Sequence, residues 1–271
     1  MPPLPLQLIH GFLVGLAGLL PGLCGSTLLV LFGIYRPLTA ALAHPCSGFR
    51  QKWLRFGPFF LAAGAGLLVG SRVLAAVFAR HETATLFLFM GFMLGALPDL
   101  FAQARQAKGN TGGWIAFVVL FLACLALDIG RDRLDPRAGG MQDRWEVWAL
   151  AGAGIGLGSM IPGASVAFIL IAFDLYQPLL DGVGRLDAGI LVPVVIGAGI
   201  AIFAFARVAD WLFRHAEGIA IRGVLGLAAG SLWLVYPGWP GAASGWRCLL
   251  LLGAGYVLSA RLNRWGRPDR S

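Results

Sequence analysis

Charged side chains are scarce in this chain. Only 13% of its 271 residues are Asp, Glu, Lys or Arg, whereas 58% are hydrophobic and the mean hydropathy is +0.77. A soluble globule of this length needs more polar side chains to cover its surface, so the composition excludes that class and indicates an integral membrane protein. The net charge of +8 then reflects basic loops that face anionic lipid, and no nucleic-acid partner is expected.

Cysteine and histidine are also few, with four of each. The cysteines lie in or next to apolar segments without a paired spacing, which predicts neither a disulfide framework nor a zinc site. The histidines fall near the ends of apolar segments and suggest no cluster. We therefore expect no metal, no cofactor and no catalytic residue.

A stretch rich in glycine and proline occurs twice. Residues 15–38 read GLAGLLPGLCGSTLLVLFGIYRPL, and residues 156–179 read GLGSMIPGASVAFILIAFDLYQPL. This pattern indicates an internal duplication. Aligned without a gap, in what we call the hairpin register, the copies share Gly15/Gly156, Leu16/Leu157, Pro21/Pro162, Gly22/Gly163, Leu29/Leu170, Phe32/Phe173, Tyr35/Tyr176, Pro37/Pro178 and Leu38/Leu179.

Each copy predicts a broken helix inside the membrane. Proline ends a helix, glycine lets the chain reverse, and a hydroxyl side chain can cap the arm that follows. The arms of the second copy, residues 147–160 and 166–180, are shorter than the roughly 17 residues that a spanning helix needs. We therefore predict re-entrant helical hairpins at residues 4–43 and 147–180, although the longer first copy is also compatible with two short spans.

The duplication continues beyond the hairpins. Equivalent residues there are separated by slightly fewer positions along the chain than in the hairpin register, and we call this second alignment the span register. In it Arg72 falls on Arg207, Gly91 on Gly226 and Gly95 on Gly230. The fold class is thus an all-α integral membrane protein of two repeats, each a hairpin plus three transmembrane helices. The first repeat is residues 1–127, a charged linker is 128–146, the second repeat is 147–260 and a basic tail is 261–271; the predicted spans are 57–79, 83–100, 114–127, 189–213, 219–236 and 246–260.

Three spans are an odd number, so the second repeat must enter the membrane from the opposite side, as in the inverted repeats of many transporters. The side that holds both termini collects more basic residues than the side that holds the linker. The positive-inside bias therefore predicts cytoplasmic termini. The basic residues on that side are Arg50, Lys52, Arg55, Arg105, Lys108, Arg214, Arg222, Arg261, Arg264, Arg267 and Arg270.

The paired breaks PGLCGST and IPGASVAF, each followed by a Tyr-x-Pro exit, resemble those of the PopT-type polyprenyl-phosphate transporters. The resemblance extends to the segments FGPFFLAAGAGLLVGSRVLAAVF and FLFMGFMLGALPDL and covers nearly the whole chain. It implies a flippase that returns undecaprenyl phosphate, the lipid carrier of bacterial envelope synthesis, to the cytoplasmic leaflet of the inner membrane. Cys24, Ser26 and the pair Val166-Ala167 depart from the family pattern, so the second tip is more apolar than the resemblance implies.

The two hairpin tips are the expected substrate site. A helix that begins in mid-membrane directs unpaired N–H groups and the positive end of its dipole into a cavity, and phosphate is a ligand that such ends favour. The alternative is that the breaks only relieve packing between helices. The candidate residues are Gly22, Cys24, Gly25, Ser26, Thr27, Gly163 and Ser165.

Arg72 and Arg207 are the remaining candidates for phosphate binding, because an arginine within a span usually faces a cavity or a partner. Both lie in the last third of their spans, where snorkelling to the interface is the alternative. Asp210 follows Arg207 at helical spacing, which favours an ion pair. Asp174 stands where the first copy has Gly33, and it could carry a coupling proton or line a wet crevice.

Two other function classes remain open. An integral-membrane enzyme acting on a lipid phosphate needs a nucleophile or a metal site, and no histidine lies near Ser26 or Ser165 in sequence. A small-anion transporter could use the same scaffold, and a side opening toward the bilayer would distinguish a lipid substrate from it. The oligomeric state is not predicted.

Overall fold

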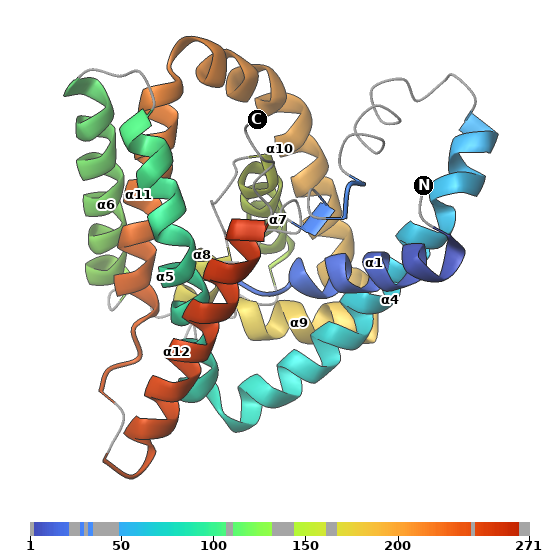
Figure 1. The fold of residues 1–271 in the computed structure, drawn as a ribbon, viewed down its shortest axis with the longest axis horizontal. Coiled ribbons are helices and arrows are strands. Elements are labelled where there is room, and N and C mark those ends of the chain that lie inside the picture. Colours follow the sequence, from blue (N-terminus) through green and yellow to red (C-terminus); the bar gives the residue numbers. More distant parts are fainter. Residues whose placement is uncertain are drawn as a thin grey trace.

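The computed structural model describes residues 3–21, 28–29, 32–34, 49–106, 111–131, 144–160, 167–239 and 242–265, and these form helices and short connections with no strand (Figure 1). For some helical residues, including 205–215, it describes the backbone alone. The helices are α1 (Leu4–Ala17), α4 (Phe49–Arg80), α5 (Glu82–Gln106), α6 (Thr111–Arg131), α7 (Trp145–Met160), α8 (Ala167–Ala172), α9 (Tyr176–Arg185), α10 (Ala188–His215), α11 (Glu217–Val235) and α12 (Ala242–Trp265).

Several of these helices are suited to a membrane. Within the described ranges Phe56–Arg80, Glu82–Gln106 and Gly218–Val235 are long and apolar enough to cross, and α9 with α10 would make a fourth span that is bent by 110°. The all-helical, membrane-capable class is therefore confirmed. Gly112–Ala126 of α6 is a shorter apolar helix in the described part of the chain, and the six predicted spans stay a prediction.

Large apolar side chains cover the outer surface of the helices. Leu61 of α4 is 77% exposed, and Phe203 of α10 is 85% exposed. In water such surfaces would be unfavourable, whereas in a bilayer they contact acyl chains. The exposed faces of α4 and α10 are thus suited to lipid.

The helices pack as pairs that recur in the two halves. Within the halves α1 packs on α4 and α7 packs on α10, while between the halves α5 packs on α12 and α6 packs on α11. Figure 1 shows these last two pairs next to each other on the left, and α11 is also in contact with α5. If each helix is replaced by its equivalent in the other half, the α1–α4 pair becomes the α7–α10 pair, and the α5–α12 pair becomes the α11–α6 pair.

The two pairs within the halves share a close backbone contact. A Cβ atom on Gly15 of α1 would overlap the carbonyl oxygen of Ala63 on α4, and a Cβ on Gly156 of α7 would overlap that of Ala198 on α10. The two glycines are equivalent in the hairpin register, and the two alanines are equivalent in the span register. Glycine permits the same close backbone approach in both pairs.

The pairs between the halves follow the same rule. A Cβ atom on Gly91 of α5 would overlap the carbonyl oxygen of Leu252 on α12, and one on Gly226 of α11 would overlap that of Phe117 on α6. In the span register Gly91 is equivalent to Gly226, and Phe117 is equivalent to Leu252. The register of the duplication, read from the sequence, is therefore also the register of the helix packing.

Both copies contain a left-handed residue in the second arm. Gly33 has φ of +68° and Asp174 has φ of +54°. The next amide in each copy closes the helix end, from Ile34 to the carbonyl of Leu29 at 2.9 Å and from Leu175 to that of Leu170 at 2.8 Å. The arm predicted at residues 166–180 is consequently not one helix, because this turn separates α8 from α9.

The core lies where α4, α5, α7 and α9 meet. Phe89, Trp148 and Leu180 are among its most deeply buried side chains, and Phe78 and Tyr176 belong to the same cluster. The start of α9 is therefore held in the centre of the molecule.

Candidate functional site

Helix α9 has two different faces. Tyr176, Leu180 and Val183 are buried in the core, whereas Gln177, Asp181 and Arg185 follow each other at four-residue spacing on another face. A helix with this pattern buries its apolar stripe and keeps its polar stripe accessible. In Figure 1, α9 lies beside α4, and the two helices are in contact.

Tyr176 joins the two hairpin regions. Its hydroxyl donates a hydrogen bond to the carbonyl oxygen of Leu19 at 2.5 Å, and its ring packs edge-on against Phe78 and Phe89 with centroids 6.0 Å away in each case. Leu19 lies just beyond the end of α1, where backbone carbonyls need partners from outside the helix. The Tyr-x-Pro exit of the second copy thus binds the backbone at the break of the first.

Arg72 of α4 is fixed to the end of α9. Its Nε donates to the carbonyl oxygen of Gly184 at 2.6 Å. At the same helix end the amide of Asp187 bonds to the carbonyl of Gly182 at 2.9 Å, across the left-handed residue Leu186. A guanidinium at a helix C-terminus satisfies a late carbonyl and complements the negative end of the dipole.

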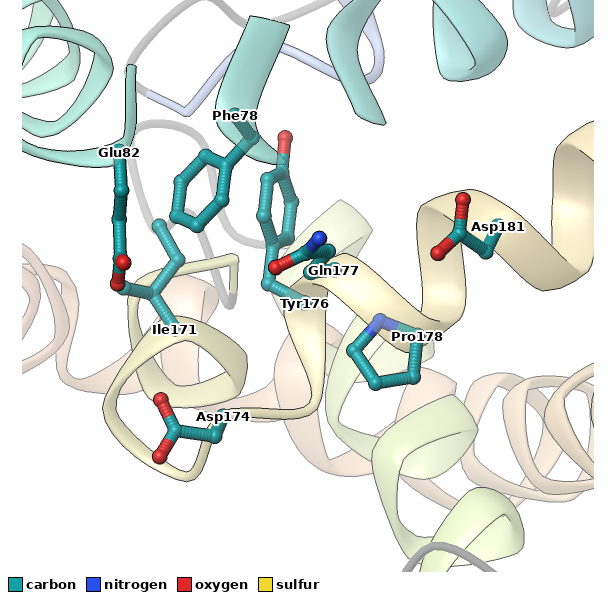
Figure 2. A pocket seen from close by; sticks show the side chains of 8 residues that line it. All are labelled: Phe78, Glu82, Ile171, Asp174, Tyr176, Gln177, Pro178 and Asp181. Atoms are coloured by element: carbon teal, nitrogen blue, oxygen red, sulfur yellow. The ribbon is translucent and has the colours of Figure 1, made fainter. Parts of the chain in front are cut away.

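A first pocket of about 280 Å³ lies at the start of α9. Figure 2 shows Asp174 before the helix, Gln177 at its start and Asp181 one turn further on, with Glu82 on the same side of the view as Ile171 and Asp174. The complete lining is Phe78, Glu82, Ile171, Asp174, Tyr176, Gln177, Pro178 and Asp181. Three carboxylates make this pocket acidic.

A second pocket of about 240 Å³ lies between α4 and α9, and it shares Gln177 and Asp181 with the first. Its cationic side chains are Arg72 and Arg185, and Asp181 is its carboxylate. The wall toward α4 is made of alanines, so the pocket combines a basic rim with small apolar side chains. Its full lining is Arg72, Ala75, Ala76, Ala79, Gln177, Leu180, Asp181, Gly184 and Arg185.

The predicted site residues fall into two groups. Arg72 and Asp174 line the neighbouring pockets around α9. The hairpin-tip candidates Gly22, Cys24, Gly25, Ser26, Thr27, Gly163 and Ser165 lie outside the described residues, as do the side chains of Arg207 and Asp210. In the described part of the chain no three His, Cys, Asp or Glu side chains are arranged to hold a metal ion.

Sequence reasoning missed the polar residues of these pockets. By sequence alone Glu82 belongs only to a turn, and Gln177, Asp181 and Arg185 belong to an apolar arm and its exit. Their four-residue spacing is the signal that could have revealed a polar helix face.

Comparison with known proteins agrees with the resemblance stated above. The chain matches the family described as undecaprenyl phosphate translocase-like over residues 3–113 and 111–248. A polyprenyl-phosphate transporter of Vibrio cholerae is 23% identical in an alignment of 244 positions, and the alignment covers 84% of this chain and 76% of that protein. A polyprenyl-phosphate transporter of Staphylococcus aureus is 24% identical in an alignment of 274 positions, and the alignment covers 96% of each protein. No solved structure matches the chain. The chain therefore belongs to the undecaprenyl phosphate translocase-like family.

Proposed function

We propose that this protein is a flippase that returns undecaprenyl phosphate to the cytoplasmic leaflet of a bacterial inner membrane, for reuse in cell-envelope synthesis. Membership of the translocase-like family supports this function, as do two relatives named as polyprenyl-phosphate transporters. The described helices long enough to cross a bilayer fit a membrane transporter. In this proposal the protein moves its substrate and does no chemistry on it.

The recurrence of helix packing is the observation that carries the mechanism. Contacts at Gly15 and Gly156, and at Gly91 and Gly226, are repeated in the register of the duplication. Two like halves with an odd number of spans each are related by an axis in the membrane plane, and such halves can exchange inward-open and outward-open states. The proposed action is alternating access, with both termini in the cytoplasm and the linker in the periplasm.

The phosphate head is proposed to cross at the hairpin tips while the polyprenyl chain stays in lipid. Gly25, Ser26 and Thr27 at the first tip, with Gly22 and Cys24, would offer backbone N–H groups and hydroxyls to the anion. Gly163 and Ser165 would do the same at the second tip, with fewer donors. Helix ends that face each other across a cavity can hold a phosphate without any metal.

Arg72 and Arg207 are proposed to meet the phosphate on the periplasmic and cytoplasmic sides. Support for Arg72 comes from its place in the second pocket, where its bond to Gly184 holds the guanidinium beside open space. The backbone of Asp174 has the left-handed conformation, so we propose that this residue serves to end α8. Proton coupling by its carboxylate is the alternative role.

Substitution at Gly25 tests the tip site. Gly25→Glu places a negative charge where the phosphate is proposed to sit, so repulsion should abolish binding of the phosphate at the tips and with it the transport of undecaprenyl phosphate. Gly25→Gln is the matched control, because it has nearly the same volume without the charge. We expect the Gln variant to keep measurable transport. If the Glu variant still binds and moves the lipid, the phosphate does not sit at the tips.

A further inference from the structure

The second pocket, between α4 and α9, brings together two arginines from separate helices. Arg72 comes from the last third of α4, and Arg185 is the last residue of α9. They lie in different halves of the chain, and the contact of α9 with α4 at Gly184 places both on one cavity. The arrangement is therefore a product of the fold.

The charge of this pocket favours an anion. Two guanidinium groups outweigh the single carboxylate of Asp181, and the amide of Gln177 adds a polar group that can donate. The Nε of Arg72 is committed to Gly184, so its terminal amino groups are the ones left to face the cavity. Arginine binds phosphate oxygens with strong, charge-assisted hydrogen bonds, and a phosphate monoester carries about −1.5 to −2 charge near pH 7.

The size of the pocket fits a headgroup and not a whole lipid. Its volume of about 240 Å³ lies below the roughly 300 to 1,000 Å³ of sites that enclose drug-sized ligands. Ala75, Ala76 and Ala79 form its wall on α4. Immediately beside them Val73 is 59% exposed and Val77 is 43% exposed, so an isoprenoid chain leaving the pocket would meet apolar side chains.

We infer that this pocket is a docking site where the phosphate monoester head of a polyprenyl phosphate is captured from the leaflet on the linker side, before it reaches the hairpin tips. Arg72 has a second task, because it also fastens α9. Arg185 is therefore the arginine that makes the pocket selective for phosphate. The chain of the lipid lies along the exposed face of α4. This inference rests on the proposed function and adds an entry site to it.

The test compares binding by full-length variants in nanodiscs of phosphatidylcholine, with undecaprenyl phosphate and inorganic phosphate as separate probes. Arg185→Gln should weaken binding of the lipid phosphate on the order of tenfold, from the loss of a charge-assisted bond. Arg185→Lys should restore part of it, because the charge returns without the planar fork. Arg247→Gln is the matched control, since Arg247 is also an exposed arginine but lies on α12.

The outcomes separate this inference from the proposed function. If the wild type binds the lipid in nanodiscs and transports it in vesicles, while Arg185→Gln binds it as tightly as Arg247→Gln does, the docking site is wrong and the transport function stands. If inorganic phosphate binds the wild type as tightly as the lipid does and is lost with Arg185, the pocket is a free-anion site and the docking of lipid is overturned. If the wild type neither binds nor moves undecaprenyl phosphate, both fail.

Discussion

Replacing Tyr176 with phenylalanine isolates one hydrogen bond at the centre of the molecule. The change removes only the hydroxyl that donates to the carbonyl of Leu19, and it keeps the ring that packs on Phe78 and Phe89. Side-chain hydrogen bonds between membrane helices average about 0.6 kcal/mol and reach about 1.7. Leaving a buried acceptor without its partner raises the loss to about 1 to 3 kcal/mol. Because Tyr176 is only 4% exposed, we expect Tyr176→Phe to lower the free energy of unfolding by about 1 to 2 kcal/mol.

Equilibrium unfolding in mixed detergent micelles measures this loss. The matched control is Tyr256→Phe on α12, whose side chain is on the outer surface and 42% exposed. A surface change of this kind should stay within about 0.5 kcal/mol of wild type. Equal unfolding free energies for the two variants would refute the claim that Tyr176 secures the end of α1.

Three further predictions test packing, backbone conformation and topology. Gly15→Ala should destabilise the protein by about 1 to 3 kcal/mol through overpacking. The control Gly64→Ala should be neutral or stabilising, because an added Cβ there meets nothing within 4 Å. Equal losses of unfolding free energy for the two variants, measured in micelles, would contradict this prediction. Asp174→Gly should keep both fold and lipid transport, because glycine adopts the left-handed conformation freely, and a folded variant that cannot transport would instead support proton coupling. Cysteine at Gly139 should react with an impermeant thiol reagent added to the periplasmic side and cysteine at Gly266 should not, and the reverse labelling would invert the proposed orientation.

Much of the fold could be predicted because the duplication carries packing information. The span register pairs Gly91 with Gly226, and the structure uses both glycines for the same close approach between helices. Apolar composition likewise predicted the all-helical membrane class, since hydropathy over long segments is a strong signal. Both predictions rest on patterns that extend over many residues, namely the repeat and the apolar segments.

The turn at Asp174 and the helix that follows it were not predicted. In sequence, residues 166–180 form one apolar arm, and Asp174 looks like an isolated embedded carboxylate. The signal was its equivalence to Gly33, because glycine and aspartate are both tolerated in the left-handed region. A reading that treats Asp174 as a replacement for a conformationally special glycine would have placed the turn.

The contacts that build the pockets could not be predicted from periodicity. Tyr176 and Leu19 are 157 residues apart, and Arg72 and Gly184 are 112 residues apart. Hydrophobic period and charge count describe which face a residue lies on, but they do not say which distant element packs against that face. The sequence therefore marked Arg72 as a site candidate without revealing Arg185 beside it.

Leaflet-resolved measurement of undecaprenyl phosphate in vesicles that contain the purified protein tests the central claim most directly. With inorganic phosphate followed in the same sample, the account predicts that the lipid moves from one leaflet to the other with its phosphate intact and that empty vesicles show no such movement. Release of inorganic phosphate would identify an enzyme instead of a flippase. An unchanged leaflet distribution in vesicles with folded protein would contradict the proposed function altogether.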